Sequence, residues 1–324
     1  MRIYILVACL WLATNPLEGK IVFYSGRDGA AEIYTMNSDG SNQTRVTHDP
    51  TKAVSPSWSP NGQQIIFDSS RGSQVEVDYN IWLIDADGGN PRQLTHHPEW
   101  DNYPDWSPDG NQIAFDSDRL SKEGEPPKTE IYVMDADGSN VKQVTDIGFA
   151  SQPRWSPDGE WILFEGDIDQ GRGIYAIRPD GTDMWQVSEP VPGAALYLGG
   201  WSPDGKRVLY KGTIGNVRNS FAIIVTLNKS GRVKVKKREE VPMPKMPFQT
   251  ISFGADGKSI LFGGQNFGNW DIYRFRLDTH ELIRLTDHFK GDLNPRERNP
   301  RLPVSPQDLT PTLWGEIKAN SHHH

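Results

Sequence analysis

Short apolar segments alternate with turn-forming residues along most of the chain, and they recur in the same order. One segment ends in Trp-Ser-Pro-Asp-Gly or a close variant, and its aromatic residue is here named the anchor. The anchors are Trp58, Trp106, Trp155, Trp201 and Phe253, and a degraded copy, NPRL, puts Leu302 in the sixth anchor place. Successive anchors are 46 to 52 residues apart. Because a repeated supersecondary unit recurs at a fixed period and catalytic residues do not, the motif indicates architecture rather than a reactive site.

A second motif recurs five times, at a steady offset from the anchors in most periods. It reads EIYTMNSDGSN from Glu32, NIWLIDADGGN from Asn80 and EIYVMDADGSN from Glu130, with diverged forms from Gly173 and Asp271. The apolar and aromatic residues favour a strand, and Asp-Gly favours a tight turn because glycine accepts a positive φ without a Cβ clash. A short segment ending in Leu-Thr or Val-Thr comes next in most copies. Each period therefore holds about four short strands.

The repeat predicts the fold. Four antiparallel strands recurring every 40 to 50 residues or so are typical of a β-propeller, and six anchors predict an all-β, six-bladed β-propeller of four-stranded antiparallel blades. The first apolar segment, residues 20–29, resembles the second strand of a blade, whereas the sixth anchor has no complete blade after it. We therefore expect the N-terminal strands to complete the C-terminal blade, which removes two exposed sheet edges.

The repeat also resembles a known family. The combination of P-x-W-S-P-D-G, I-x-F-x-S-x-R, E-I-Y-x-M-D-x-D-G-S-N and L-T is similar to the TolB-type propeller repeat, the WD40-like PD40 family, over about Ile21 to Leu302. The resemblance implies the propeller but no single activity, because related repeats occur in periplasmic binding proteins, serine peptidases and polysaccharide lyases. TolB proteins also carry an α/β domain before the propeller, and about twenty residues precede the first expected strand here. Functions of that domain are therefore not expected.

Composition fits a turn-rich chain and restricts the partners. The 324 residues include 31 glycines and 24 prolines, and the net charge is −8. This balance disfavours nucleic-acid binding through a basic field. A basic run at residues 232–238 is expected to be an outer edge strand whose lysines discourage edge-to-edge pairing. The alternative for this run is contact with an anionic surface.

The chain divides into a propeller and flanking segments. Residues 1–19 are interpreted as a signal peptide, because the apolar run from Ile3 to Ala13 is too short to span a bilayer. We expect the propeller over 20–302, a tail over 303–320 that packs on it or completes it, and a tag remnant over 321–324. The protein is then periplasmic or secreted and monomeric, with no membrane span. Lipid anchoring through Cys9, the only cysteine, is the alternative.

Candidate binding residues are those that differ between blades on one face. The connections after the Leu-Thr strands and those between second and third strands lie at the same end of an antiparallel ring. They carry the aromatic, arginine and acidic side chains that protein interfaces use as anchors and that also suit sugar faces. The predicted binding residues are Arg27, Arg71, Tyr79, Trp100, Asp101, Tyr103, Arg119 and Trp270. The alternative for the three arginines is that each pairs with a carboxylate of its own blade.

Four histidines on the same connections, His48, His96, His97 and His288, are the candidate metal ligands. Converging imidazoles hold transition metals, and the resemblance extends to lyases with a histidine-ligated metal. Turn preference after Leu-Thr or Val-Thr also accounts for these histidines. No cofactor is predicted, and a divalent metal is the alternative. The Asp-x-Asp-Gly-x-Asn runs imitate calcium loops, but the glutamate expected at the end of such a loop is missing, so they are interpreted as turns.

The sequence therefore favours a non-enzymatic binding module that uses its loop-rich face and the mouth of its central channel for a protein or peptide partner. No G-x-S-x-G elbow and no glycine-rich phosphate loop occur in the sequence. Two alternatives stay open: a metal-dependent carbohydrate-active enzyme similar to uronate lyases, and a lectin for cell-envelope glycans.

Overall fold

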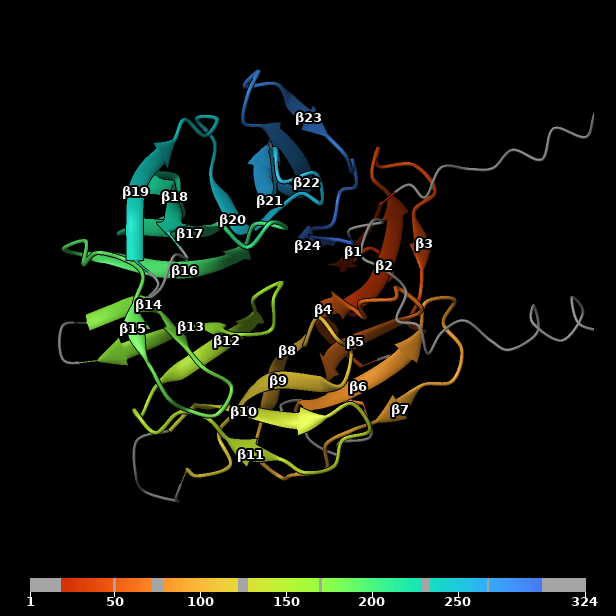
Figure 1. Ribbon diagram of the computed structural model, residues 1–324. Coiled ribbons are helices and arrows are strands. Elements are labelled where there is room, and N and C mark those ends of the chain that lie inside the picture. The colour runs from red at the N-terminus through yellow and green to blue at the C-terminus, as the bar shows by residue number, and fades with distance from the viewer. Residues whose placement is uncertain are drawn as a thin grey trace, which may run out of the picture.

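The computed structural model describes residues 19–48, 51–71, 78–121, 128–168, 171–228, 234–266 and 268–298. Within these ranges, 24 β-strands and one 3-10 helix, η1 (Val217–Asn219), form the fold. The strands build six four-stranded antiparallel sheets, arranged around a central axis like the blades of a propeller (Figure 1). The expected six-bladed, all-β architecture is confirmed. No helix in the described ranges is long and apolar enough to cross a membrane.

Each blade runs from an inner strand next to the axis to an outer strand at the rim (Figure 1). Blade 1 comprises β4 (Ala53–Trp58), β5 (Gln64–Ser69), β6 (Asn80–Asp85) and β7 (Arg92–Gln93), and blade 2 comprises β8 (Asp101–Trp106), β9 (Gln112–Ser117), β10 (Glu130–Asp135) and β11 (Lys142–Gln143). Blade 3 comprises β12 (Ala150–Trp155), β13 (Ile162–Ile168), β14 (Gly171–Ile177) and β15 (Trp185–Gln186). Blade 4 comprises β16 (Ala194–Trp201), β17 (Arg207–Ile214), β18 (Ser220–Asn228) and β19 (Lys234–Val241), and blade 5 comprises β20 (Phe248–Phe253), β21 (Ser259–Asn266), β22 (Asn269–Arg276) and β23 (Leu282–Arg284). The lysine-rich β19 is an outer strand, as expected.

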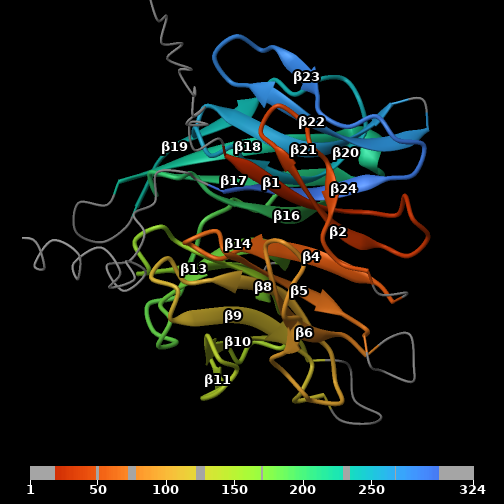
Figure 2. The ribbon, with the colours of Figure 1, turned by 90° about the vertical axis from the view of Figure 1, so that its right-hand side faces the viewer.

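The closing blade joins the two ends of the described chain. Its order is β24 (Asp292–Glu297), β1 (Lys20–Ser25), β2 (Glu32–Asn37) and β3 (Thr44–Arg45). Figure 2 shows β24, in blue, beside β1, in red, and the two strands pair antiparallel. The N-terminal strands therefore complete the blade that the C-terminal strand begins. The expected signal peptide with Cys9, the tail over 303–320 and the tag remnant lie outside the described residues, apart from Gly19.

The sixth anchor place is occupied by Glu297, so the expectation for Leu302 was wrong. Glu297 pairs with Ile21 in the same register in which Trp106 pairs with Ile113. The sequence contains Asn-Pro-Arg twice, at 294–296 and at 299–301. The fold uses the first copy, because it is the copy that aligns with β1.

Anchor residues pack between neighbouring blades. Trp106 is only 8% exposed and lies in one buried cluster with Ile81 and Leu83 of blade 1 and Ile113 of its own blade. In the described ranges, six such apolar clusters join all six pairs of neighbouring blades. The core is therefore the set of seams between blades, and the structural interpretation of the tryptophans is confirmed.

The residues after the anchor form a tight turn. Ser107 Oγ donates to Asp109 Oδ1 at 2.6 Å, and the amide of Gly110 donates to the carbonyl oxygen of Ser107 at 3.0 Å. Gly110 has φ +74°, a conformation that favours glycine. The turn leads the chain from β8 into β9, and the serine and aspartate side chains are occupied within it.

We expect Gly138→Ala to destabilise the fold more than Gly29→Ala. Gly138 follows β10 with φ +92°, and a Cβ there would lie 2.6 Å from the carbonyl oxygen of Leu94 in the preceding blade. Gly29 has φ +115° but no atom within 4 Å of its Cβ position. Both variants share a backbone strain of about 1–2 kcal/mol, so their difference in the free energy of unfolding, measured in urea, isolates the clash. Equal losses would contradict a close contact between blades at this turn.

Candidate functional site

The antiparallel blades give the ring two unlike ends. The loop face carries the connections between blades and those between second and third strands, for example residues 94–100 and 26–31. The turn face carries the Trp-Ser-Pro-Asp-Gly and Asp-Gly turns, for example residues 107–111 and 136–141. The predicted binding residues belong to the connections of the loop face and to the strands that end or begin there.

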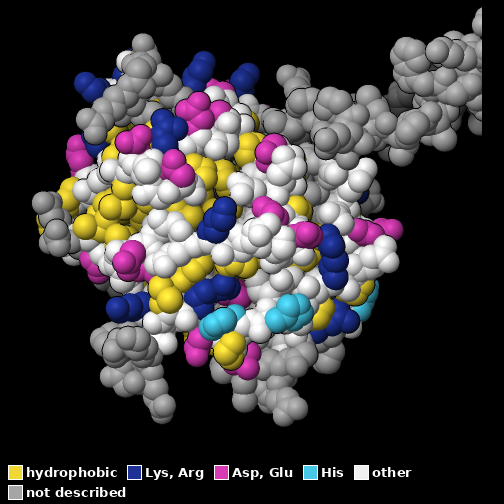
Figure 3. Space-filling view, turned by 60° about the horizontal axis from the view of Figure 1, so that its bottom comes forward, with side chains coloured by type: hydrophobic (Ala, Val, Ile, Leu, Met, Phe, Trp, Pro, Cys, Tyr) yellow, Lys and Arg dark blue, Asp and Glu magenta, His cyan; other side chains and the backbone are white. Residues whose placement is uncertain are grey.

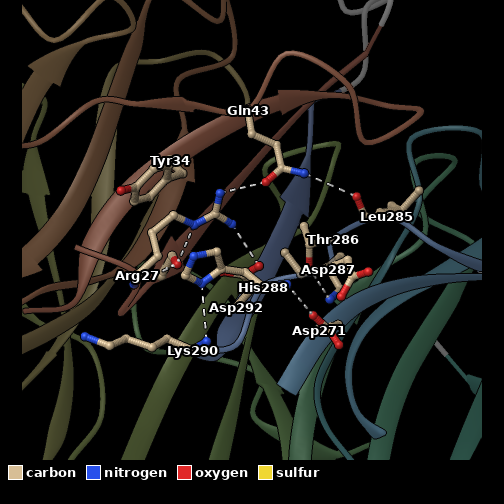
Figure 4. A network of polar contacts seen from close by, with 12 residues as sticks. Arg27, Tyr34, Gln43, Asp271, Leu285, Thr286, Asp287, His288, Lys290 and Asp292 are labelled. Carbon is tan, nitrogen blue, oxygen red and sulfur yellow. Dashed lines mark hydrogen bonds and ion pairs between the residues drawn. The ribbon is translucent and has the colours of Figure 1, made fainter. Parts of the chain in front are cut away.

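Arg27 is held on the loop face by a network within the closing blade (Figure 4). Its guanidinium donates to Asp292 Oδ2 at 2.9 Å and to Gln43 Oε1 at 2.8 Å, and its Nε donates to Ser25 Oγ at 2.9 Å. The guanidinium also lies 4.7 Å from the ring centre of Tyr34, close enough for a cation–π interaction. Because Asp292 is fully buried, this ion pair ties the start of β24 to the connection after β1.

Arg119 makes the equivalent contacts in blade 2. Its Nη2 donates to Asp101 Oδ1 at 2.9 Å, its Nε donates to Ser117 Oγ at 3.0 Å, and its guanidinium lies 4.6 Å from the ring centre of Tyr132. Asp101 is fully buried. The structure therefore places both arginines in ion pairs within their own blades, which is the alternative that the sequence left open.

Arg71 occupies the same place in blade 1 but lacks the equivalent aspartate. The inner strand β4 begins with Ala53, where β8 begins with Asp101. The Arg71 guanidinium lies 5.1 Å from the ring centre of Trp82. All three arginines share the aromatic residue of the third strand and a serine two residues earlier, whose hydroxyl oxygen accepts the arginine's backbone amide. The aspartate is present for Arg27 and Arg119, where the inner strand supplies it.

The predicted aromatic residues do not form one group. Trp100 precedes β8 in blade 2 and is 43% exposed, whereas Trp270 is partly buried on β22 in blade 5, across the ring (Figure 1). Tyr79 precedes β6, and its carbonyl oxygen accepts the amide of Asp101 at 2.9 Å. A single ligand spanning Trp100 and Trp270 would have to cross the channel mouth.

The candidate histidines are also dispersed. The Nδ1 atoms of His97 and His288 each accept the backbone amide two residues further on, at 3.2 Å. Histidine side chains appear apart from one another, among acidic and basic groups, on the side shown in Figure 3. Within the described ranges, no three histidine, cysteine or carboxylate side chains are grouped for a metal ion. The histidines follow the outer strands of three blades: His48 in the closing blade, His96 and His97 in blade 1, and His288 in blade 5.

The structure reveals a ring of polar residues that sequence reasoning missed. Each second strand has an Ile-x-Phe core or a close variant, and the residue that follows is polar in five of the six blades. At this place Asp68 in blade 1 and Asp116 in blade 2 are buried, and Lys211 in blade 4 is only 4% exposed. The sequence contains a signal for these residues, because each ionisable residue directly follows the apolar core of its strand. The channel ring, as named here, consists of Tyr24, Asp68, Asp116, Glu165 and Lys211, and Gly263 takes the sixth place.

The ring carboxylates hold bulges in the inner strands. Every inner strand shifts register against its neighbour, and Tyr103 and Gln152 have positive φ at these bulges, +51° and +57°. Asp68 accepts the amide of Tyr103 at 3.2 Å, and Asp116 accepts the amide of Gln152 at 2.8 Å. Each carboxylate therefore belongs to one blade and fixes the inner strand of the next.

Burial shifts the titration of the ring toward neutral pH. It raises the pKa of Asp68 to about 7, of Asp116 to about 8 and of Glu165 to about 7, against the opposing effect of the hydrogen bonds that they accept. Burial lowers the pKa of the Lys211 amine to about 8, and Glu165 opposes that shift. Groups perturbed in this way are concentrated at functional sites, so the channel is the candidate functional site together with the loops around its mouth.

Fold and site define a class: a six-bladed β-propeller with ionisable groups buried around its central channel. The TolB beta propeller domain matches residues 73–236. The chain therefore belongs to the TolB β-propeller family.

Relatives match over short segments. An uncharacterized protein of Agrobacterium fabrum is 38% identical over 68 residues, which are 21% of this chain and 23% of that protein. The Tol-Pal system protein TolB of Desulfosudis oleivorans is 41% identical over 54 residues, which are 17% of this chain and 12% of the relative. The chain thus spans less than a quarter of the length of these relatives.

Solved structures share the fold over most of the chain. TolB from Acinetobacter baumannii has a TM-score of 0.68 and 20% identity, covering 86% of this chain and 66% of that one. An oligogalacturonate lyase in complex with manganese has a TM-score of 0.58 and 16% identity, covering 83% of this chain and 74% of that one. At these identities the similarity is one of fold alone.

Proposed function

We propose that this chain is a non-enzymatic binding module, and that a protein or peptide partner docks on the loop face around the channel mouth. The observation that carries the proposal is the presence of exposed large apolar side chains on connections of that face, three of which are exposed by more than 40%. They are Trp100, Leu120 and Phe289, exposed by 43%, 45% and 69%. Exposed apolar and aromatic side chains among polar neighbours are typical anchors of a protein interface.

Family membership supports a protein partner and an exported protein. Some relatives are named as Tol-Pal system proteins, and the chain shares their propeller domain. We include periplasmic or secreted localisation in the proposal, with residues 1–19 as the export signal. Mass spectrometry of the N-terminus of protein isolated from the envelope fraction tests that part, and an intact Met1 would contradict it.

The double variant Trp100→Ala/Phe289→Ala should lose the partner and keep its stability. The two side chains are 43% and 69% exposed, so truncation removes interface contacts of about 2 kcal/mol or more each and little of the core. The measurement is affinity capture from solubilised cell envelope with quantitative mass spectrometry, beside the thermal unfolding midpoint.

Met184→Ala is the matched control, because Met184 is 42% exposed in an Asp-Gly turn on the opposite face. Proteins captured equally by wild type and by the double variant would contradict docking on the loop face. Glycan-array binding without protein capture would favour the lectin, and uronate turnover would favour the lyase-like enzyme.

A further inference from the structure

A cavity lies at the turn-face end of the channel. It has a volume of about 230 Å³ and is lined by the last residues of all six inner strands and the turns that follow them. Its wall contains the four anchor tryptophans, Trp58, Trp106, Trp155 and Trp201. The loop-face residues discussed above do not contribute to it.

Three arginines line this cavity, and two of them come from inner strands. Arg154, at the end of β12, is only 5% exposed, and its guanidinium donates to the carbonyl oxygen of Pro153 at 2.6 Å, while its Nε is buried without a partner. Arg296 lies at the end of β24, and its backbone pairs with β1. Its side chain makes no hydrogen bond or ion pair with the part of the chain that the structure describes. Arg298 follows it, and its Nε is likewise buried without a partner.

The two inner-strand guanidinium groups affect each other electrostatically. Burial lowers the pKa of Arg296, and the charge of Arg154 lowers it further, with only Asp105 acting in the opposite direction. Burial likewise lowers the pKa of Arg154, against the attraction of Asp105, Glu165 and Asp116. Two like charges facing one small cavity are unfavourable unless an anion lies between them.

The carboxylates that line the cavity are already engaged. Asp105 accepts the hydroxyl of Ser57 at 3.1 Å and the amide of Trp155 at 2.9 Å. Glu297 forms its ion pair with Arg274, outside the cavity lining, at 2.7 Å. Within the described ranges, neither carboxylate forms an ion pair with Arg154 or Arg296.

We propose that the turn-face end of the channel is a binding site for a small carboxylate anion, held between Arg154 and Arg296 and enclosed by the anchor tryptophans. A planar guanidinium donates two parallel hydrogen bonds to a carboxylate, and the apolar wall strengthens the charge interaction by excluding water. The volume is below the roughly 300–1,000 Å³ of drug-sized ligand sites, so the ligand is small. This site is independent of the proposed partner on the loop face.

The test is isothermal titration of the full-length protein with succinate, accompanied by tryptophan fluorescence. Succinate should bind with one site per chain and change the emission of the tryptophans in the cavity wall. Arg296→Gln should weaken binding roughly 10- to 100-fold, because a hydrogen-bonded charge is removed from the site. Arg296 is preferred to the more buried Arg154, whose replacement endangers the fold.

Control variants and ligands make the outcomes separable. Arg276→Gln, which removes an exposed arginine of blade 5 paired with Glu281, should bind succinate as wild type does. Succinamide, the uncharged analogue, should not bind. The proposal would be overturned if succinate did not bind, if Arg296→Gln bound it as tightly as wild type, or if succinamide bound equally well. A phosphate affinity equal to that of succinate would overturn the assignment to a carboxylate.

Discussion

Glu297→Ala should lower the free energy of unfolding by about 3–5 kcal/mol, because it leaves a buried arginine without its counter-charge. Arg274 Nη2 donates to Glu297 Oε1 at 2.7 Å and Nη1 donates to Oε2 at 3.1 Å, and the two side chains are only 9% and 3% exposed. Oε2 also accepts the amide of Ala255 at 2.8 Å. These contacts link β24, the inner strand of the closing blade, to β22 of blade 5 across the seam between the two blades.

The measurement is urea unfolding of wild type and variants. The matched control is Glu281→Ala, which breaks the exposed ion pair between Glu281 and Arg276 on the same blade and should cost less than about 1 kcal/mol. The double variant Arg274→Leu/Glu297→Leu should recover much of the loss, since replacing a buried pair by apolar side chains is often close to neutral. A loss for Glu297→Ala as small as that of the control would show that the seam does not depend on this pair.

Stability should fall as the pH rises from about 5.5 to about 8, because of the channel ring. The carboxyls of Asp68, Asp116 and Glu165 titrate near pH 4 in the unfolded chain, and in the folded protein burial raises their pKa to about 7, 8 and 7. Between these limits the folded state binds more protons than the unfolded state, so the free energy of unfolding decreases with pH. The slope is on the order of 1 kcal/mol per pH unit for each carboxyl.

Lys211 reverses the trend at higher pH. Burial lowers its pKa from 10.5 to about 8, so below pH 8 it is protonated in both states and contributes no slope. Above pH 8 the folded state releases this proton before the unfolded state does, and stability rises with pH. We therefore expect a minimum of stability near pH 8.

Asp116→Asn isolates one carboxyl of the ring. The variant should be more stable than wild type at pH 8 and have a shallower slope between pH 5.5 and 8, measured by urea unfolding at closely spaced pH values. Asp180→Asn is the control, since Asp180 is exposed and hydrogen bonds from Thr182 lower the pKa of its carboxyl, which places its titration below this range. Parallel pH profiles for wild type and Asp116→Asn would contradict a buried, protonated Asp116.

Sequence reasoning succeeded where a residue's role is set by local turn and strand chemistry. Trp106, for example, precedes a turn in which Ser107 is hydrogen-bonded to the aspartate and the glycine that follow it within three residues. It failed at the sixth anchor, because two copies of Asn-Pro-Arg satisfy the same local pattern and only pairing with β1 distinguishes them. It left two roles open for Arg27, because its partner Asp292 lies 265 positions away in the sequence and only the fold brings the two side chains together.

What the sequence by itself determined is the propeller: its period, its six blades, the closing of the last blade by the first strands, and the seams between blades filled by anchor residues. These follow from strand propensity, turn residues and repetition, which act over a few residues at a time. Only the tertiary structure decided which residues meet. The channel ring joins side chains from five blades, and the cavity with Arg154 and Arg296 joins strands from opposite sides of the ring. The shifted pKa values of the channel ring and the close approach of the two arginines arise from burial and from neighbours distant in the sequence. A local sequence pattern does not encode either of them.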